Sequence, residues 1–202
     1  MIKAIVLDVG GVLLRTEDDS SRRDLERKHD LSPGASEKLV FGSEAALAST
    51  IGAVGPNVIW QNVADELSLS PEALEDFKRA FWQGDQFDKE LIDFLIEMRD
   101  DYTTALLTNA WKYARDELAE NFDIREGQTV DYILISSELG VAKPDEEIYH
   151  ILKEKLNCDF EEILFVDDFE ENIKAAQELG NNTIHFKPEM DLIKTIKSKL
   201  ET

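Results

Sequence analysis

Side chains that could bind a metal ion and phosphate stand at four points along the chain, each at the end of a short apolar run or shortly after it. They are Asp8, the pair Thr108 and Asn109, Lys143, and the pair Asp167 and Asp168. Carboxylates that are brought together repel one another unless a cation lies between them. Mg²⁺ is a hard dication that prefers oxygen ligands and also binds phosphoryl oxygens. If these side chains meet in the fold, they predict a magnesium site that handles phosphate.

The neighbours of the first carboxylate and the properties of the other side chains favour the same chemistry. Gly10 and Gly11 follow Asp8 closely, and glycine lets a backbone turn tightly and approach a ligand. The hydroxyl of Thr108 and a nearby backbone N–H can donate to a phosphoryl oxygen. Lys143 supplies a compact positive charge. A carboxylate that attacks phosphorus forms an aspartyl-phosphate, which is an established covalent strategy.

Apolar runs and segments of helical period must position these residues. The runs cover residues 2–7, 104–107, 132–135 and 163–166, with a weaker run at 183–186. The first four runs are continuous rather than alternating, which indicates strands that are buried on both faces. The segments of helical period are 89–99, 112–120, 145–156, 170–179 and 190–200. Strands that alternate with helices predict an α/β fold with a doubly wound parallel sheet, in which the carboxyl ends of the strands converge on one crevice.

A block without a convincing strand, residues 16–85, interrupts this alternation. Within it, Ser70 is a capping residue and Pro71 stands at the first helical position, which indicates that a helix begins there. We therefore predict a Rossmann-like three-layer parallel sheet core of residues 1–15 and 86–202, with a small all-helical cap inserted at 16–85. Four aromatic residues of this block fit a helical core better than a surface that stacks on substrate: Trp60, Phe77, Phe81 and Trp82.

Four motifs, taken in order, resemble those of the haloacid dehalogenase superfamily. They are Leu7-Asp8-Val9-Gly10-Gly11-Val12-Leu13, Leu106-Leu107-Thr108-Asn109, Gly140-Val141-Ala142-Lys143-Pro144, and Phe165-Val166-Asp167-Asp168 through Asn172. One such motif is a weak signal, but four in order at expected strand ends are specific. The helical insertion between the first two motifs is similar to the subgroup with an α-helical cap, subfamily IA. The resemblance covers nearly the whole chain and implies a Mg²⁺-dependent hydrolase of the phosphatase type.

The resemblance also implies a role for each matching residue. Asp8 matches the nucleophile and a metal ligand, and the backbone carbonyl of Gly10 matches a second ligand. Asp168 matches the acidic metal ligand, while Asp167 binds the metal directly or through water. The other matches are Thr108 as the phosphate-binding hydroxyl, Asn109 as a further phosphate or substrate contact, Lys143 as the charge that steadies the nucleophile and the phosphoryl group, and Asn172 as a support for the second acidic pair.

The chain departs from the family's phosphatases at Gly10, where those enzymes carry a second aspartate. That aspartate protonates the leaving group, and loss of such an acid lowers a rate by about 10²–10⁴-fold. Three explanations stay open. In the first, the substrate has a good leaving group, as acyl and aryl phosphates do. In the second, an acid from elsewhere in the chain replaces the missing one, with Glu17, Asp18 and Asp19 as the nearest candidates. In the third, the chain is a catalytically weak module that binds phosphate or a phosphoprotein.

The composition limits the classes of partner. The 202 residues include 43 Asp and Glu against 22 Lys and Arg, and the resulting net charge of -21 repels nucleic acid and anionic membranes. We therefore expect a small phosphorylated substrate, no nucleic acid and no membrane as partners, and a monomer or homodimer. The single cysteine, Cys158, and an N-terminal run too short for a signal segment lead us to expect a cytoplasmic protein.

Overall fold

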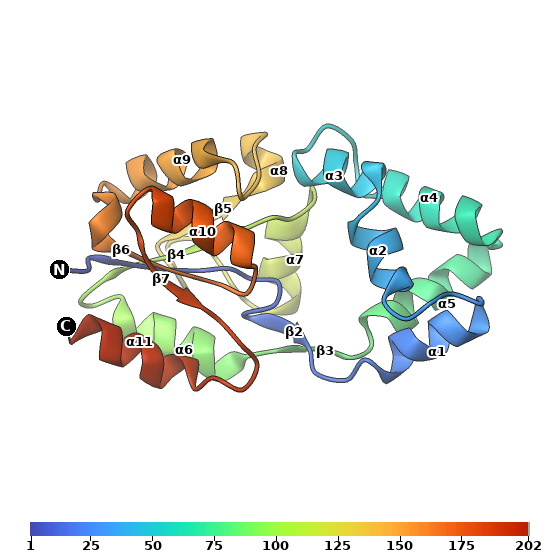
Figure 1. Cartoon of the computed structure of the whole chain (residues 1–202), viewed down its shortest axis with the longest axis horizontal. Helices are drawn as coiled ribbons and strands as arrows, with labels where there is room; N and C mark the ends of the chain where they lie inside the picture. The colour runs from blue at the N-terminus through green and yellow to red at the C-terminus, as the bar shows by residue number, and fades with distance from the viewer. Residues whose placement is uncertain (202) are drawn as a thin grey trace.

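The computed structural model describes residues 1–201 and contains a five-stranded parallel sheet between two layers of helices (Figure 1). The strand order is β5-β4-β1-β6-β7. The strands are β1 (Ala4–Leu7), β4 (Thr103–Thr108), β5 (Tyr132–Ile135), β6 (Ile163–Asp167) and β7 (Asn182–His185). From β1 the chain builds one side of the sheet out to β5, then crosses to β6 and β7 on the other side. The strand order therefore reverses beside β1, and the predicted α/β fold is confirmed.

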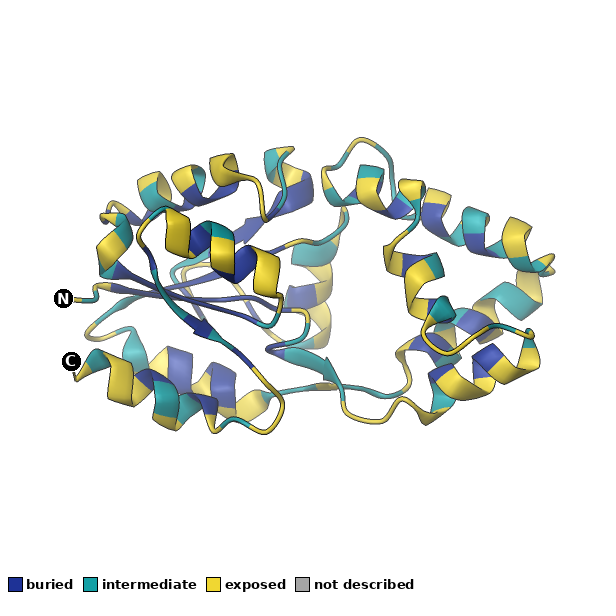
Figure 2. Ribbon diagram, viewed as in Figure 1, coloured by how far each residue is buried: buried dark blue, intermediate teal, exposed yellow. Residues whose placement is uncertain are grey.

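Alternate side chains of the strands face two separate hydrophobic clusters, one on each side of the sheet. In β1, Ile5 and Leu7 belong to one cluster, while Ala4 and Val6 belong to the other. The covering helices are α6 (Lys89–Met98), α7 (Ala114–Asn121) and α11 (Leu192–Leu200) over the first cluster, and α9 (Glu146–Leu156) and α10 (Glu170–Glu178) over the second. Figure 2 shows the inner strands and the inward faces of these helices as buried, while the edge strand β7 is mostly intermediate. This three-layer, Rossmann-like arrangement is the one predicted.

Capping side chains set the beginnings of several helices in the core. Asp88, Asp145 and Asp191 each accept a hydrogen bond from a backbone N–H two or three residues later, at the first turns of α6, α9 and α11. The five predicted helices begin and end within two residues of the observed ones. Two shorter helices were not predicted, because one turn shows no period: α8 (Ser136–Leu139) and the 3₁₀ helix η1 (Phe160–Glu162). None of the helices within residues 1–201 is long and apolar enough to cross a membrane.

Five helices occupy residues 20–82, between the first motif and α6. They are α1 (Ser20–Lys28), α2 (Ala35–Phe41), α3 (Glu44–Thr50), α4 (Asn57–Leu67) and α5 (Pro71–Trp82). They enclose a third hydrophobic cluster, in which Phe77 and Phe81 are fully buried. The hydroxyl of Ser70 accepts a hydrogen bond from the first turn of α5, and Pro71 stands at the first helical position, as the sequence indicates. The division into a core and a cap at residues 16 and 85 stays a prediction.

A two-stranded antiparallel sheet lies where the chain passes between these helices and the parallel sheet (Figure 1). It consists of β2 (Leu14–Thr16) and β3 (Asp85–Phe87), and the hydroxyl of Thr16 donates to Asp85 across the pair at 2.7 Å. The sequence did not predict these strands, because three residues that are mostly polar show neither alternation nor a continuous apolar run. The β2–β3 pair therefore holds together the two chain segments that link the five helices to the parallel sheet.

The buried guanidinium of Arg22 ties α1 to the β2–β3 pair. It donates to the Phe81 carbonyl at 2.9 Å, to Glu37 at 2.6 Å and to Asp85 at 2.8 Å. It also lies over the Phe81 ring, 4.3 Å from the centroid. Because the side chains of Arg22 and Asp85 are only 7% and 11% exposed, their charges have little access to water. Loss of one partner therefore leaves a poorly solvated charge.

We expect Arg22→Met to lower the free energy of unfolding by about 3 kcal/mol, because the apolar replacement leaves the Asp85 carboxylate without its cation. Urea denaturation followed by circular dichroism measures the change. The matched control is Arg23→Met on the same helix, where the pair with Asp19 is more than half exposed and should change stability by about 0.5 kcal/mol or less. Equal effects of the two substitutions would contradict this account.

Candidate active site

The carboxylate of Asp8 lies at the carboxyl end of the central strand β1. Its backbone N–H donates to the Val166 carbonyl of β6, which continues the sheet by one residue. Its Oδ1 accepts hydrogen bonds from the Val9 N–H at 2.7 Å and from the Lys143 Nζ at 2.9 Å. Within residues 1–201 no donor reaches its second oxygen, Oδ2. One oxygen is therefore fixed, and the other is available to a ligand.

The ammonium group of Lys143 is completely buried and uses all three of its hydrogens. Its Nζ contacts Asp8 Oδ1 at 2.9 Å, Asp167 Oδ2 at 2.7 Å and the Leu107 carbonyl at 2.9 Å. Burial alone would lower the pKa of Lys143, but the two carboxylates outweigh it and raise that pKa, so the group is cationic. Lys143 therefore joins the ends of β1, β4 and β6 with a single charge.

Asp167 is fully buried, and donors occupy both of its oxygens. Oδ1 accepts from the Phe169 N–H at 2.8 Å and the Asn172 amide at 3.0 Å, and Oδ2 accepts from Lys143 and again from Asn172 at 3.1 Å. The structure thus brings Asn172 to the second acidic pair, where the family resemblance expects it. Because neither oxygen is free of protein donors, this environment favours the water-mediated form of the predicted metal contact.

Carboxylate oxygens of Asp8, Asp167 and Asp168 lie within 4.8 Å of one another. Burial raises the pKa of Asp8 to about 7 against the opposing attraction of Lys143, and burial likewise raises the pKa of Asp168. Three carboxylates and one ammonium leave two negative charges when all are ionised. A dication with oxygen ligands would balance that charge and favour the ionised carboxylates. The residues present therefore fit Mg²⁺.

The two glycines after the first carboxylate differ in what surrounds them. Gly11 has φ of +78°, and a Cβ at this position would lie 2.2 Å from Asp168 Oδ2, so only glycine allows Asp168 to approach. A Cβ built on Gly10 meets no atom within 4 Å, and Gly10 itself is exposed. The backbone therefore requires glycine at position 11, but position 10 has room for a side chain.

The segment after β4 brings two further predicted residues to this edge of the sheet. The side chain of Thr108 is buried, and its hydroxyl has no hydrogen-bond partner among residues 1–201. The side-chain amide of Asn109 donates to the Lys143 carbonyl at 2.8 Å and accepts from the Lys143 N–H at 2.9 Å. The Thr108 hydroxyl is thus available to a ligand, while Asn109 holds the backbone of Lys143. A direct substrate contact by Asn109 stays a prediction.

The three acidic residues that were considered as replacements for the missing acid have partners close by in the sequence. Glu17 pairs with Arg15 at 2.9 Å, Asp18 accepts from the Ser20 N–H at 2.9 Å, and Asp19 pairs with Arg23. Throughout residues 1–201, none of the three forms a hydrogen bond or ion pair with Asp8, Lys143, Asp167 or Asp168. The structure therefore offers no support for a replacement acid from this run.

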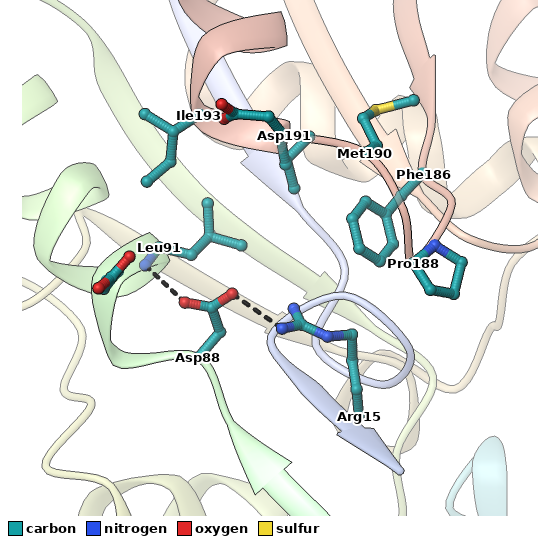
Figure 3. Close-up of a pocket in the computed structure, with 10 residues that line it drawn as sticks. Arg15, Asp88, Leu91, Phe186, Pro188, Met190, Asp191 and Ile193 are labelled. Carbon is teal, nitrogen blue, oxygen red and sulfur yellow. Dashed lines mark hydrogen bonds and ion pairs between the residues drawn. The ribbon is translucent and has the colours of Figure 1, made fainter. Parts of the chain in front are cut away.

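A separate pocket of about 180 Å³ lies beside the β2–β3 pair (Figure 3). Its lining includes Arg15, Asp88 and Phe186 but none of the residues gathered around Lys143. In Figure 3 the Arg15 guanidinium points toward Asp88, at 3.0 Å, with Phe186 beside it. The ion pair between Arg15 and Asp88 connects the β2–β3 pair to the start of α6. We therefore interpret this pocket as a structural contact between segments and not as the site of chemistry.

The family model of haloacid dehalogenase-like hydrolases matches residues 2–180 of this chain. The chain is 27% identical, over 205 aligned residues, to D-ribitol-5-phosphate phosphatase from Bacteroides thetaiotaomicron, and the match covers 94% of this chain and 93% of that protein. It is 35% identical over 86 residues to mouse bifunctional epoxide hydrolase 2, covering 41% of this chain. That match spans only 15% of the length of the mouse protein.

A solved structure shows the same fold over nearly the full length. It is the HAD family enzyme bt-2542 of Bacteroides thetaiotaomicron, in complex with magnesium and inorganic phosphate. The TM-score is 0.74 at 24% identity, and the match covers 95% of this chain and 97% of the other. At this identity the likeness establishes the shared fold alone.

Proposed function

This chain belongs to the haloacid dehalogenase-like hydrolases, and on that premise we propose that it hydrolyses small phosphate esters or acyl phosphates with Asp8 as the nucleophile and Mg²⁺ as the cofactor. The observation that carries the proposal is the buried Lys143, which holds one oxygen of Asp8 while the other has no protein donor, within the cluster of Asp8, Asp167 and Asp168. The full-length similarity to a sugar-alcohol phosphate phosphatase supports a small phosphorylated substrate.

The proposed reaction has two steps, both at phosphorus. In the first, Asp8 Oδ2 forms a bond to phosphorus while the bond to the leaving-group oxygen breaks, and the leaving group takes the electron pair. The Thr108 hydroxyl and the Lys143 ammonium stabilise the phosphoryl oxygens. In the second step, the oxygen of a water bonds to the phosphorus of the aspartyl-phosphate while the bond from phosphorus to Asp8 Oδ2 breaks. This restores the Asp8 carboxylate and releases inorganic phosphate, and a proton of the water passes to the solvent.

Mg²⁺ would be held by Asp8, the Gly10 carbonyl and Asp168, with Asp167 direct or through water. When bound, it neutralises negative charge on the phosphoryl group and orients it toward the nucleophile. The magnesium and phosphate complex of the Bacteroides enzyme supports this choice of ion.

The exposed glycine at position 10 favours a second candidate, a protein that binds phosphate with little turnover. An alkoxide leaving group needs a proton, and the first step of the proposed reaction has no positioned acid to supply it. A carboxylate or an aryl oxide leaves without that help. We therefore propose that acyl and aryl phosphates are turned over and that alkyl phosphates are turned over slowly.

Metal removal tests the proposed function. We expect the wild type to release phosphate from p-nitrophenyl phosphate and acetyl phosphate in Mg²⁺, and chelation with EDTA to lower both rates by about 10²-fold or more, because the two excess negative charges of the site would then face the anionic substrate. Added Mg²⁺ should restore the rates. Release that is unchanged after chelation would contradict a magnesium-dependent site, and no release from either substrate would favour the binding protein.

A further inference from the structure

Four aromatic side chains form a closed ring of contacts between the cap helices and the core. We call them the aromatic cluster: Phe41, Trp60, Trp82 and Trp111. The ring centroids are 5.8 Å apart for Phe41 and Trp82, 6.4 Å for Trp82 and Trp60, 6.2 Å for Trp60 and Trp111, and 5.9 Å for Trp111 and Phe41. The fully buried Phe81 contacts three of the four, so the cluster has a packed aromatic base.

Part of this aromatic surface is not covered by protein. Phe41 is 44% exposed and Trp82 is 37% exposed, while Trp60 and Trp111 are half-buried. The prediction that Trp82 belongs to the helical core was therefore wrong, although Phe77 and Phe81 do belong to it. Trp82 is the last residue of α5, so no further turn of that helix covers its ring. Large exposed aromatic surfaces of this kind commonly mark binding sites.

Trp111 stands three positions after Thr108 and so connects the aromatic cluster to the phosphate site. Its Cα lies at most about 11 Å from that of Thr108, since consecutive Cα atoms are 3.8 Å apart. The segment between them is fixed: Asn109 bonds to Lys143, and the Ala110 N–H donates to the Ser136 hydroxyl at 3.0 Å. That hydroxyl donates to the Thr50 carbonyl of α3 at 2.6 Å, which ties the segment to the cap helices.

The position of the aromatic cluster and the missing acid point to the same class of substrate. Within the proposed function, a phosphoryl group beside Asp8 and Thr108 would place its leaving group within a small molecule's length of Trp111. An aryl oxide spreads its negative charge over the ring and leaves without a positioned acid, and its flat apolar ring suits stacking on indole and phenyl groups. A sugar alkoxide has neither property.

Resting on the proposed function, we propose that the aromatic cluster binds the leaving group and that the substrates are phosphate monoesters of aromatic hydroxyl groups. Asp8 Oδ2 bonds to phosphorus, the bond from phosphorus to the aryl oxygen breaks, and the aryl oxide departs with the electron pair and takes its proton from water. Trp111 and Phe41 contact the ring before and during this step.

The test compares two substrates that both leave without an acid, 2-naphthyl phosphate and acetyl phosphate, of which only the first carries a ring. We expect Trp111→Leu to lower the ratio of kcat/KM for naphthyl over acetyl phosphate by about tenfold, mainly through KM, because one aromatic contact is lost. Trp111→Phe keeps an aromatic ring and should therefore retain most of the wild-type ratio of kcat/KM. Phe41→Leu, at a more exposed position, should lower it in the same direction and serves if Trp111→Leu unfolds.

Phe160→Leu is the matched control. Phe160 is a half-buried aromatic residue in η1, at the amino end of β6 and so at the opposite ends of the strands from Asp8, and its ring centroid lies 5.2 Å from that of His150. It should leave the ratio within about twofold of the wild type. A ratio unchanged in both Trp111→Leu and Phe41→Leu would show that the cluster only packs the cap helices on the core. The proposed function fails separately, if the wild type hydrolyses neither substrate in a manner that depends on Asp8.

Discussion

Asp8→Asn is expected to lower kcat for acetyl phosphate and p-nitrophenyl phosphate by a factor on the order of 10³ or more. Asparagine has nearly the same shape, but its amide is a poor nucleophile and cannot form the aspartyl-phosphate. Lys143 keeps two of its three acceptors, Asp167 and the Leu107 carbonyl, so its position should persist. Initial rates of phosphate release, with the substrate varied, measure the change.

The fold should survive this substitution, which makes the loss of activity interpretable. The site carries more carboxylates than cations, and burial raises the pKa of Asp8, so replacing its charge by a neutral amide relieves repulsion. Without metal, we expect the variant to melt at or above the wild-type temperature. Wild type that is quenched in acid during turnover should carry one acid-stable, base-labile phosphoryl group, and the variant should carry none. Activity within tenfold of the wild type would rule out Asp8 as the nucleophile.

Much of the core and the location of the site could be predicted from the sequence, because both depend on local signals. Continuous apolar runs indicated β1, β4, β5 and β6, which are buried on both faces, and a weaker run indicated the edge strand β7, in which only Ile184 is buried. The polar residues directly after them had to meet at one edge, since parallel strands end on the same side. Lys143 lies outside any strand, so its place at this edge was expected only from its position shortly after the run 132–135, and its contact with Asp8 was expected from the motif resemblance.

What could not be predicted depends on contacts between distant parts of the chain. Arg22 and Asp85 are 63 residues apart, and nothing in either neighbourhood indicates that they pair. Trp111 belongs to the loop after β4 but packs with aromatic side chains of α2 and α4. Local patterns also do not show that Asp8 keeps one oxygen free while Asp167 has none, because that difference arises from donors on three separate segments.

Gly10→Asp is expected to raise kcat/KM for an alkyl phosphate such as D-ribitol 5-phosphate or glycerol phosphate by about 10²-fold or more. The carboxyl group would supply the proton that an alkoxide leaving group needs and would then accept a proton from the attacking water. A Cβ at this position meets no atom within 4 Å, and the position is exposed, so the side chain enters without displacing others. The required glycine is its neighbour Gly11, where φ is +78°.

The substitution separates a weak enzyme from a binding protein. Acetyl phosphate needs no proton on its leaving group, so its kcat/KM, which reports formation of the aspartyl-phosphate, should change by less than about tenfold in Gly10→Asp. Gly10→Asn is the matched control, because it has the same size but no acidic proton, and it should show no gain with the alkyl phosphate. A selective gain in Gly10→Asp would mean that Asp8, Thr108 and Lys143 are already arranged for catalysis. No gain, in a variant that still binds Mg²⁺ and phosphate, would mean that the pocket evolved toward binding and that the missing acid is only one of its losses.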